Sequence, residues 1–290
     1  MNNKVEYCLR MVERNLPFHV RYFLMFCRSR RRMPYVFSKQ DYNDYIFWDC
    51  YFNRHKKHAY LADKYEVRHY VEEKGLGSIL TKLYGVWDSS DEIDFEKLPN
   101  QFAIKCNHSC GMNIIVHDKA NSDIGQIRNH LAEWLKMKHP VYFERHYNFI
   151  KPRIICEELI PSELDGTFPI DYKIHCANGK PVFIQCCTER TETSVGKRVV
   201  YSPQWEKMPF TVHDILFTDE DIDRPTSLDE MLKVASILSK DLKYARIDLY
   251  EVRGRVLFGE ITLTPMGGIL NSLTPEALKL MGEEIRKNNK

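Results

Sequence analysis

A strict alternation of polar and apolar residues near the C-terminal end constrains the fold of this chain more than any other feature. In the segments 246–249 and 260–263, polar residues occupy the even positions, and isoleucine or leucine occupies the odd positions. This period of two predicts two β-strands, each with one polar and one apolar face. If a turn centred on Gly254 joins them, Asp248 pairs with Glu260, whereas a two-residue turn would place these carboxylates on opposite faces.

The predicted pairing of the two carboxylates indicates a metal site. Asp248 and Glu260 would repel each other across the ladder and would lose hydration on a half-buried sheet. A divalent cation relieves both penalties, and an all-oxygen ligand set favours Mg²⁺, or Mn²⁺, over zinc. The alternative is a solvated face on which Arg246, predicted to pair with Thr262, neutralises one carboxylate.

The rest of the chain predicts an α+β protein, in which helices come first and then mix with strands. Apolar runs predict strands at 102–106, 113–116, 153–160, 171–176 and 182–187, and amphipathic spacing predicts helices at 123–136, 227–238 and from 274 onward. Asn178-Gly179 between two alternating runs predicts a tight hairpin. A length of 290 residues with 43% hydrophobic residues suits one large unit or two domains.

Charge and cysteine content narrow the class of protein. Lys and Arg number 42 against 40 Asp and Glu, a net charge of +2, which argues against general nucleic-acid binding. Nine cysteines without framework spacing predict a reducing compartment. Neither a membrane-spanning stretch nor a signal-peptide pattern is found, so we expect a cytoplasmic protein.

Residues 1–60 are aromatic and basic and predict a helical N-terminal region. Four arginines lie within five positions, at Arg28, Arg30, Arg31 and Arg32. One interpretation is an ordinary helix with a solvated basic end. The other is peripheral contact with the inner face of an anionic membrane, or with a partner in glycan assembly.

Two further segments carry groups suited to binding a nucleotide. Lys105 ends a predicted strand and is followed by the loop 107–111, whose backbone amides can cradle phosphate; an ordinary turn is the alternative. Glu157 and Glu158 are neighbours in an apolar strand, so one must point inward and needs a donor, either an adenine amino group or an arginine.

Several motifs in sequence order resemble the TupA-like ATP-grasp family of polysaccharide and teichuronopeptide biosynthesis. They occupy residues 98–111 with 114–119, 171–181, and 246–250 with 258–265, and residues 84–88 are also similar. The resemblance covers about residues 60 to 285. It implies an ATP-grasp fold over 61–285, in which two α+β subdomains clasp ATP: a nucleotide-binding lobe at about 98–187 and a metal-site lobe at about 188–285.

The resemblance also implies roles for individual residues. The nucleotide would be bound by Lys105, His108, Ser109, Gly111, Glu157, Glu158, Ile160, Asp171 and Lys173. The metal would be bound by Asp248 and Glu260, with Thr262 in the place where related enzymes usually carry asparagine. Arg246 would steady the acyl centre, and the substrate carboxylate or phosphate would meet Arg190, Lys197 and Arg198.

Together these features predict an ATP-dependent carboxylate–amine ligase that forms an amide through an acyl-phosphate. By the resemblance, its substrates are a sugar carboxylate of a cell-surface polysaccharide precursor and an amine, with a uronic acid and an amino acid as the expected pair. The alternatives are a glycan kinase on the same fold and a non-catalytic carbohydrate-binding or glycosyltransferase-associated module.

Overall fold

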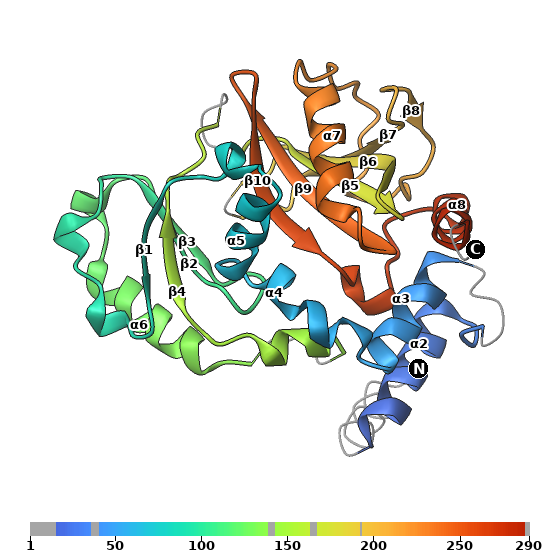
Figure 1. Ribbon diagram of the computed structural model, residues 1–290, viewed down its shortest axis with the longest axis horizontal. Helices are drawn as coiled ribbons and strands as arrows, with labels where there is room; N and C mark the ends of the chain where they lie inside the picture. Colours follow the sequence, from blue (N-terminus) through green and yellow to red (C-terminus); the bar gives the residue numbers. More distant parts are fainter. Residues whose placement is uncertain (1–15, 36–40, 139–142, 163–166, 192, 288–290) are drawn as a thin grey trace.

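Two antiparallel sheets organise the molecule, whose computed structural model describes residues 16–35, 41–138, 143–162, 167–191 and 193–287. The smaller sheet, in the order β1-β4-β2-β3, contains β1 (Leu83–Trp87), β2 (Phe102–Cys106), β3 (Asn113–Val116) and β4 (Ile154–Glu157). The larger sheet, in the order β10-β9-β5-β6-β7-β8, contains β5 (Asp171–Ala177), β6 (Lys180–Thr188), β7 (Lys197–Tyr201), β8 (Lys207–Met208), β9 (Tyr244–Val252) and β10 (Arg255–Thr262). Figure 1 shows the two sheets next to each other, each with its own helices. The predicted α+β class is confirmed.

Helix α6 (Ile124–Lys136) covers one face of the smaller sheet. Its first turn is capped by Asp123, whose carboxylate accepts a hydrogen bond from a backbone amide at 2.9 Å. Ile127 and Leu131, four residues apart on the helix, pack with Phe102 of the sheet in one apolar cluster. Burying each of these side chains contributes about 1.5–3 kcal/mol, so one face of the sheet is committed to the core.

Helices α5 (Glu66–Glu73) and α7 (Leu228–Ser239) pack on one face of the larger sheet. Ile247 and Leu249 of β9 belong to the same buried cluster as apolar residues of both helices. Because side chains alternate along a strand, the even-numbered residues of this part of β9 point to the opposite face. That face is where Asp248 lies.

The turn between β9 and β10 differs from the prediction. Val252 pairs with Arg255, which leaves a two-residue turn of Arg253 and Gly254. Their φ angles are 51° and 73°, and two consecutive positive values are typical of a type I′ hairpin. The prediction of a turn centred on Gly254 is therefore wrong.

A β-bulge at Gly259 nevertheless produces the predicted pairing. The register shifts by one residue before Glu260, which therefore pairs with Asp248, and the same register pairs Arg246 with Thr262. A Cβ atom at position 259 would lie 2.9 Å from the backbone oxygen of Asp248, so the close approach needs glycine. The extra residue of the bulge offsets the even-numbered turn, and the carboxylate pairing is confirmed for a different physical reason.

The strands of the smaller sheet all end at or before Glu157 in the sequence, and the strands of the larger sheet begin at Asp171. Strands β5 and β6, which the resemblance assigns to the nucleotide-binding lobe at 98–187, thus share a sheet with β9 and β10. The hairpin that joins β5 to β6 turns at Asn178 and Gly179, both with positive φ, as predicted. Strand β4 ends three residues before the predicted strand 153–160 does.

The described part of the N-terminal region, residues 16–35 and 41–60, is helical, as predicted, and packs against the C-terminal helix; residues 1–15 and 36–40 of that prediction lie outside the described residues. It contains α2 (Phe18–Arg30), α3 (Tyr42–Tyr51), the 3₁₀ helix η1 (Arg54–His58) and α4 (Ala59–Ala62), and α8 (Pro275–Arg286) lies beside α3 (Figure 1). The remaining 3₁₀ helices are η2 (Gly77–Ile79), η3 (Ser90–Glu92), η4 (Phe95–Lys97), η5 (Lys119–Asn121), η6 (Arg145–Phe149) and η7 (Pro265–Gly268). Tyr22 and Phe26 of α2 are fully buried in a cluster that includes Phe47 of α3 and Leu278 of α8. This shared core attaches the first helices to the larger sheet.

Part of the basic N-terminal segment forms internal ion pairs. The Arg32 guanidinium donates to Asp44 at 2.8 Å and to Asp41 at 2.7 Å, and Arg30 donates to the backbone oxygen of Leu270 at 3.2 Å. Arg28 and Arg31 are exposed, so the interpretation of a solvated basic end holds for those two residues and not for Arg30 and Arg32. Membrane contact stays a prediction. Among the described residues, no helix combines the length and apolarity that crossing a bilayer requires.

Candidate active site

A cleft of about 330 Å³ lies between the two sheets and is lined by residues of both. Strands β2, β3 and β4 supply one wall, and β5, β9 and β10 supply the other. Ten of the residues predicted for the site line it: Lys105, Gly111, Glu157, Glu158, Ile160, Asp171, Lys173, Arg190, Asp248 and Glu260. Segments as far apart in sequence as 105 and 260 therefore meet in one place.

The paired carboxylates lie in the cleft, in unequal environments. Asp248 is 1% exposed, whereas the side chain of Glu260 is 46% exposed. The Arg246 guanidinium donates two hydrogen bonds to Asp248, at 2.7 and 2.6 Å, and one to Glu260 at 3.0 Å. Burial raises the pKa of the Asp248 carboxyl, but Arg246 and Lys173 lower it more, so this pKa lies below its ordinary value. Asp248 is therefore a buried anion at neutral pH.

The donor set at this end of the cleft suits a hard divalent cation. Asp248 and Glu260 face each other, and the Thr262 hydroxyl donates to Glu260 Oε1 at 2.9 Å, so three oxygen-bearing side chains converge. The described residues include no cluster of three or more His, Cys, Asp and Glu that would complete a metal site from protein alone. Oxygen ligands completed by substrate phosphates are the usual coordination of Mg²⁺. The residues present fit that ion.

A buried network continues from Asp248 toward β5. Lys173 donates to Asp248 at 2.7 Å and to Asp171 at 2.6 Å, and Arg190 lies 3.5 Å from Asp171. Burial lowers the pKa of Lys173, but the two carboxylates raise it above its ordinary value. The ammonium group is therefore permanently charged and is held at the floor of the cleft.

Glu157 is the inward-pointing member of the predicted acidic pair. It is buried and forms ion pairs with Lys105 and, at 2.6 Å, with Arg68, whereas Glu158 is exposed. Burial raises the pKa of Glu157, and the charges of Lys105 and Arg68 bring it below its ordinary value. The predicted donor to the buried glutamate is thus an arginine, helped by the lysine.

The loop after β2 presents only its second half to the cleft. Cys110 and Gly111 line the cleft, and Gly111 has a φ of 71°, which favours glycine. His108 and Ser109 are buried away from the lining, and the His108 ring contacts the backbone oxygen of Met137 at 3.1 Å. These two residues, which were predicted to contact the nucleotide, are therefore not among those that line the cleft.

Lys64 is a cleft residue that the sequence patterns did not single out. Its ammonium group donates to the Ser109 backbone oxygen, and its backbone amide donates to the Asn107 oxygen at 3.3 Å. Burial lowers the pKa of Lys64, and the charge of Glu260 acts in the opposite direction. The residue lies in a loop without periodicity, and its contacts are more than forty residues away in the chain, so no local pattern points to it.

Two predicted substrate contacts lie outside the cleft. Lys197 and Arg198 are on β7, and Lys197 donates to the Ile215 backbone oxygen at 3.2 Å. Arg246 and Thr262 do not line the cleft themselves but bind the carboxylates that do.

Apolar and aromatic side chains also line the cleft. Leu159, Ile160, Phe168, Tyr250 and Phe258 line it, and the Arg190 guanidinium lies 5.7 Å from the centre of the Tyr250 ring. A flat aromatic base would pack between such side chains. The cleft thus combines apolar walls with charged groups, as a nucleoside triphosphate requires.

A sequence profile described as TupA-like ATP-grasp matches residues 44–286. The match begins within α3 and ends with α8, so it extends beyond the 60 to 285 of the motif resemblance. No curated protein matches the chain significantly.

Solved structures with similar folds include ATP-grasp proteins of low sequence identity. D-alanine–D-alanine ligase from Bacillus anthracis, complexed with ATP, is 15% identical with a TM-score of 0.49, and the match covers 78% of this chain and 64% of that one. A RimK domain ATP-grasp protein from Sphaerobacter thermophilus is 10% identical with a TM-score of 0.43, covering 93% and 95%. The ATP-grasp ligase PsnB, complexed with minimal precursor, Mg and ADP, is 9% identical with a TM-score of 0.37, covering 70% and 50%. The chain thus spans just under two thirds of the Bacillus ligase.

Proposed function

The chain belongs to the TupA-like ATP-grasp family and is an ATP-grasp enzyme, and from this premise we propose that it is an ATP-dependent carboxylate–amine ligase. The proposed reaction transfers the γ-phosphate of ATP to a substrate carboxylate, and an amine then displaces phosphate to form an amide. The proposed substrates are a uronic acid of a cell-surface polysaccharide precursor and an amino acid. This choice of substrates rests on the family resemblance.

The observation that carries the proposal is the buried ionic network around Asp248 at one end of a cleft. Arg246 and Lys173 hold Asp248 in place, and Glu260 faces it from the neighbouring strand with a half-exposed carboxylate. Arg246 bridges the two carboxylates, but like charges across a ladder still repel. A divalent cation bound by both carboxylates would offset the repulsion between them.

We assign ATP to the cleft, with its base against apolar lining residues such as Leu159 and Ile160 and its phosphates near the lysines. Lys64 and Lys105 line the cleft on the side of the smaller sheet and Lys173 lines it on the side of the larger sheet, so three ammonium groups would meet the phosphates. The backbone at Gly111 is open, since a Cβ atom there would meet nothing within 4 Å. Such small-residue loops let backbone amides approach phosphate oxygens.

The residues around the paired carboxylates have two different proposed roles, metal binding and stabilisation of the acyl-phosphate. Asp248, Glu260 and Thr262 would hold Mg²⁺, which neutralises the charge that builds up on the transferred phosphoryl group. Arg246 uses Nε and Nη2 to bind the two carboxylates, which leaves Nη1 to donate to the oxygen of an acyl-phosphate. Removing one such donor from an acyl-transfer site lowers the rate by about 10²–10³.

The reaction would take place in the cytoplasm, where ATP is available. The free, mostly buried cysteines of the described residues suit a reducing compartment. Contact of the N-terminal region with the membrane, or with a partner in glycan assembly, would bring the enzyme to its precursor, and both remain proposals.

An ADP-release assay with a set of uronic acids and amino acids tests the function. We expect ADP to form only when both an acid and an amine are present, together with one equivalent of amide detected by mass spectrometry. Glu260→Gln should abolish turnover. Glu251→Gln is a matched control because Glu251 lies on the same hairpin outside the cleft and binds Thr226 instead.

The same assay distinguishes the alternatives. A phosphorylated sugar formed without any amine would identify a glycan kinase and refute the ligase. Absence of ATP binding, measured by titration calorimetry with Mg²⁺ and a non-hydrolysable ATP analogue, would favour a non-catalytic carbohydrate-binding module.

A further inference from the structure

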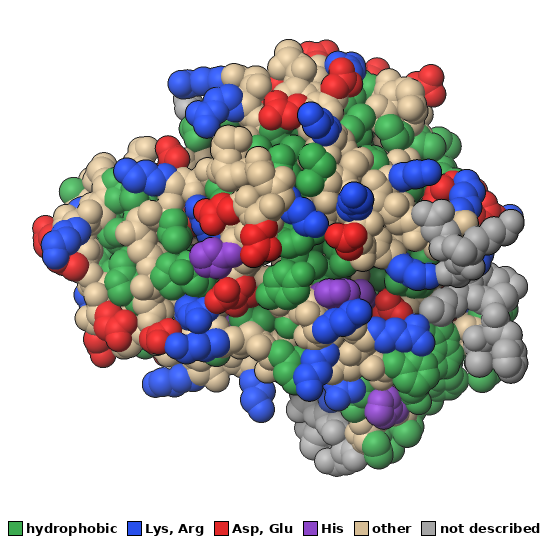
Figure 2. Space-filling model, in the orientation of Figure 1, with side chains coloured by type: hydrophobic (Ala, Val, Ile, Leu, Met, Phe, Trp, Pro, Cys, Tyr) green, Lys and Arg blue, Asp and Glu red, His purple; other side chains and the backbone are tan. Residues whose placement is uncertain are grey.

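Arg68 of α5 is a buried cation that does not itself line the cleft. Helix α5 packs on the larger sheet through Val67 and Val71, which share a buried cluster with Ile247. Its outer side is polar, and Figure 2 shows acidic, basic and histidine side chains gathered over this helix. Arg68 is only 9% exposed, so its side chain points into the molecule and not into this charged surface.

The Arg68 guanidinium reaches from α5 to the smaller sheet. Nη1 donates to Glu157 Oε1 of β4 at 2.6 Å, and Nη2 donates to the Thr81 backbone oxygen at 2.6 Å. Thr81 lines the cleft just before β1, and the backbone oxygen of the next residue, Lys82, accepts a hydrogen bond from the Glu158 amide at 2.8 Å. In Figure 1, α5 lies between β10 and the smaller sheet. One side chain thus connects the helix on the larger sheet with two segments at the edge of the cleft.

Glu157 is shared between two cations. Its Oε1 accepts the hydrogen bond from Arg68, and its Oε2 forms the ion pair with Lys105. The side chains of Arg68 and Glu157 are 11% and 9% exposed, whereas the side chain of Lys105 is 23% exposed and lines the cleft. Lys105 is therefore the cation of this trio that a ligand in the cleft can reach.

The charge balance of the trio depends on Arg68. Two cations and one carboxylate leave a net charge of +1. Without Arg68, Glu157 and Lys105 would form a neutral pair, and both carboxylate oxygens would be available to the ammonium group. Coulomb interactions are stronger in a protein interior than in water, so the loss of one buried charge would be felt at the cleft.

The geometry of the contacts requires an arginine. The guanidinium is planar and donates in fixed directions, which lets it bind the Glu157 carboxylate and the Thr81 backbone oxygen at the same time. Lysine carries the same charge on a single nitrogen atom, so it would keep the charge balance without reproducing both hydrogen bonds.

We propose that Arg68 is a positioning residue of the ATP cleft that acts through Glu157. By neutralising this carboxylate, Arg68 leaves the positive charge of Lys105 available to a nucleotide phosphate. The inference rests on the proposed binding of ATP in the cleft. It adds a residue of α5, outside the cleft lining, to the groups that determine the affinity for the nucleotide.

A double-mutant cycle tests this role by titration calorimetry on the full chain, with Mg²⁺ and a non-hydrolysable ATP analogue. We expect Arg68→Gln to weaken binding at least tenfold, because the trio loses its net positive charge. Adding Glu157→Gln to Arg68→Gln restores a net charge of +1, so this double variant should bind within threefold of the wild type. A purely structural Arg68 predicts the opposite, since the second substitution would remove a further buried contact and restore nothing.

Two more variants serve as controls. Arg68→Lys keeps the charge, so we expect at most a threefold loss of affinity. Arg224→Met removes an exposed arginine that binds Asp229 at 2.8 Å outside the cleft, and it should leave the affinity unchanged. Thermal melts without nucleotide identify any variant that does not fold. If Arg68→Gln is one of them, the double variant, in which position 157 carries no charge, still answers the question by its affinity.

Three outcomes would refute the role of Arg68: wild-type affinity in Arg68→Gln, a loss of tenfold or more in the double variant, or a loss in Arg68→Lys as large as in Arg68→Gln. Failure of the wild type to bind the analogue would instead refute the proposed function. The two failures are therefore distinguishable in the same experiment.

Discussion

Removing the two carboxylates of the cleft one at a time should change the free energy of unfolding by very different amounts. Asp248 is 1% exposed and accepts three charge-assisted hydrogen bonds, two from Arg246 and one from Lys173. In Asp248→Ala both cations lose a buried counter-charge, which costs about 3–5 kcal/mol. Glu260 is half exposed and accepts one bond from Arg246, so Glu260→Ala should cost only about 0–1 kcal/mol.

Equilibrium urea denaturation without ligand measures this difference directly. We expect the unfolding midpoint to fall strongly for Asp248→Ala and little for Glu260→Ala, with unchanged slopes. Asp248→Asn, which keeps the size and one acceptor oxygen, should fall between them. The addition of Mg²⁺ and ATP should stabilise the wild type and neither alanine variant, since both carboxylates belong to the proposed metal site.

Two results would refute this reasoning. If Glu260→Ala were as destabilising as Asp248→Ala, the exposed carboxylate would be part of the structural network and the division of roles would be wrong. If Mg²⁺ and ATP stabilised Glu260→Ala as much as the wild type, Glu260 would not be a metal ligand.

Three further predictions concern single residues. Gly259→Ala should lower stability by about 1–3 kcal/mol and weaken Mg²⁺-ATP binding, because a Cβ atom there meets the Asp248 backbone oxygen at 2.9 Å; calorimetry showing wild-type affinity would contradict this. Burial lowers the pKa of His175 to about 3, so near pH 5 the unfolded chain binds a proton that the folded chain does not. The free energy of unfolding should therefore fall by about 2 kcal/mol between pH 7 and pH 5. His175→Gln should make this fall smaller, measured by urea denaturation at both pH values. Lys64→Ala should weaken ATP binding about tenfold, whereas Lys82→Ala, an exposed lysine outside the lining, should leave the dissociation constant unchanged.

Much of the site was predictable because strands and tight turns produce patterns among neighbouring residues of the sequence. The alternation around Asp248 and Glu260 placed both on one face, and Asn178-Gly179 marked a hairpin that the structure contains. The motif order pointed to the family whose profile matches residues 44–286. These inferences succeed because the alternation of a strand and the φ preference of a turn depend on neighbouring residues alone.

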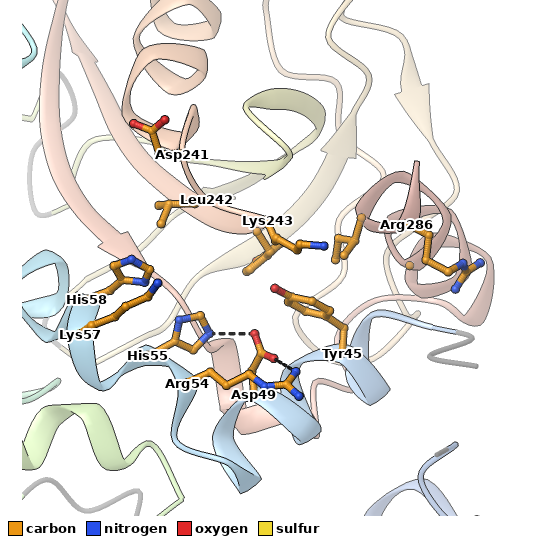
Figure 3. A pocket seen from close by; sticks show the side chains of 13 residues that line it. Tyr45, Asp49, Arg54, His55, Lys57, His58, Asp241, Leu242, Lys243 and Arg286 are labelled. Atoms are coloured by element: carbon orange, nitrogen blue, oxygen red, sulfur yellow. Dashed lines mark hydrogen bonds and ion pairs between the residues drawn. The ribbon is translucent and has the colours of Figure 1, made fainter. Parts of the chain in front are cut away.

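The partners of these residues were decided only by the tertiary structure. Glu157 binds Arg68, which is 89 residues away, and Lys64 reaches the cleft from a loop without periodicity. A second cavity likewise lies between α3, η1, β9 and α8 (Figure 3), and no pattern in the sequence predicts that these elements meet. Even the carboxylate pairing depends on the bulge at Gly259, which the alternation could not distinguish from an odd-numbered turn. Periodicity determines which face a side chain occupies, whereas the packing of distant elements determines what that face meets.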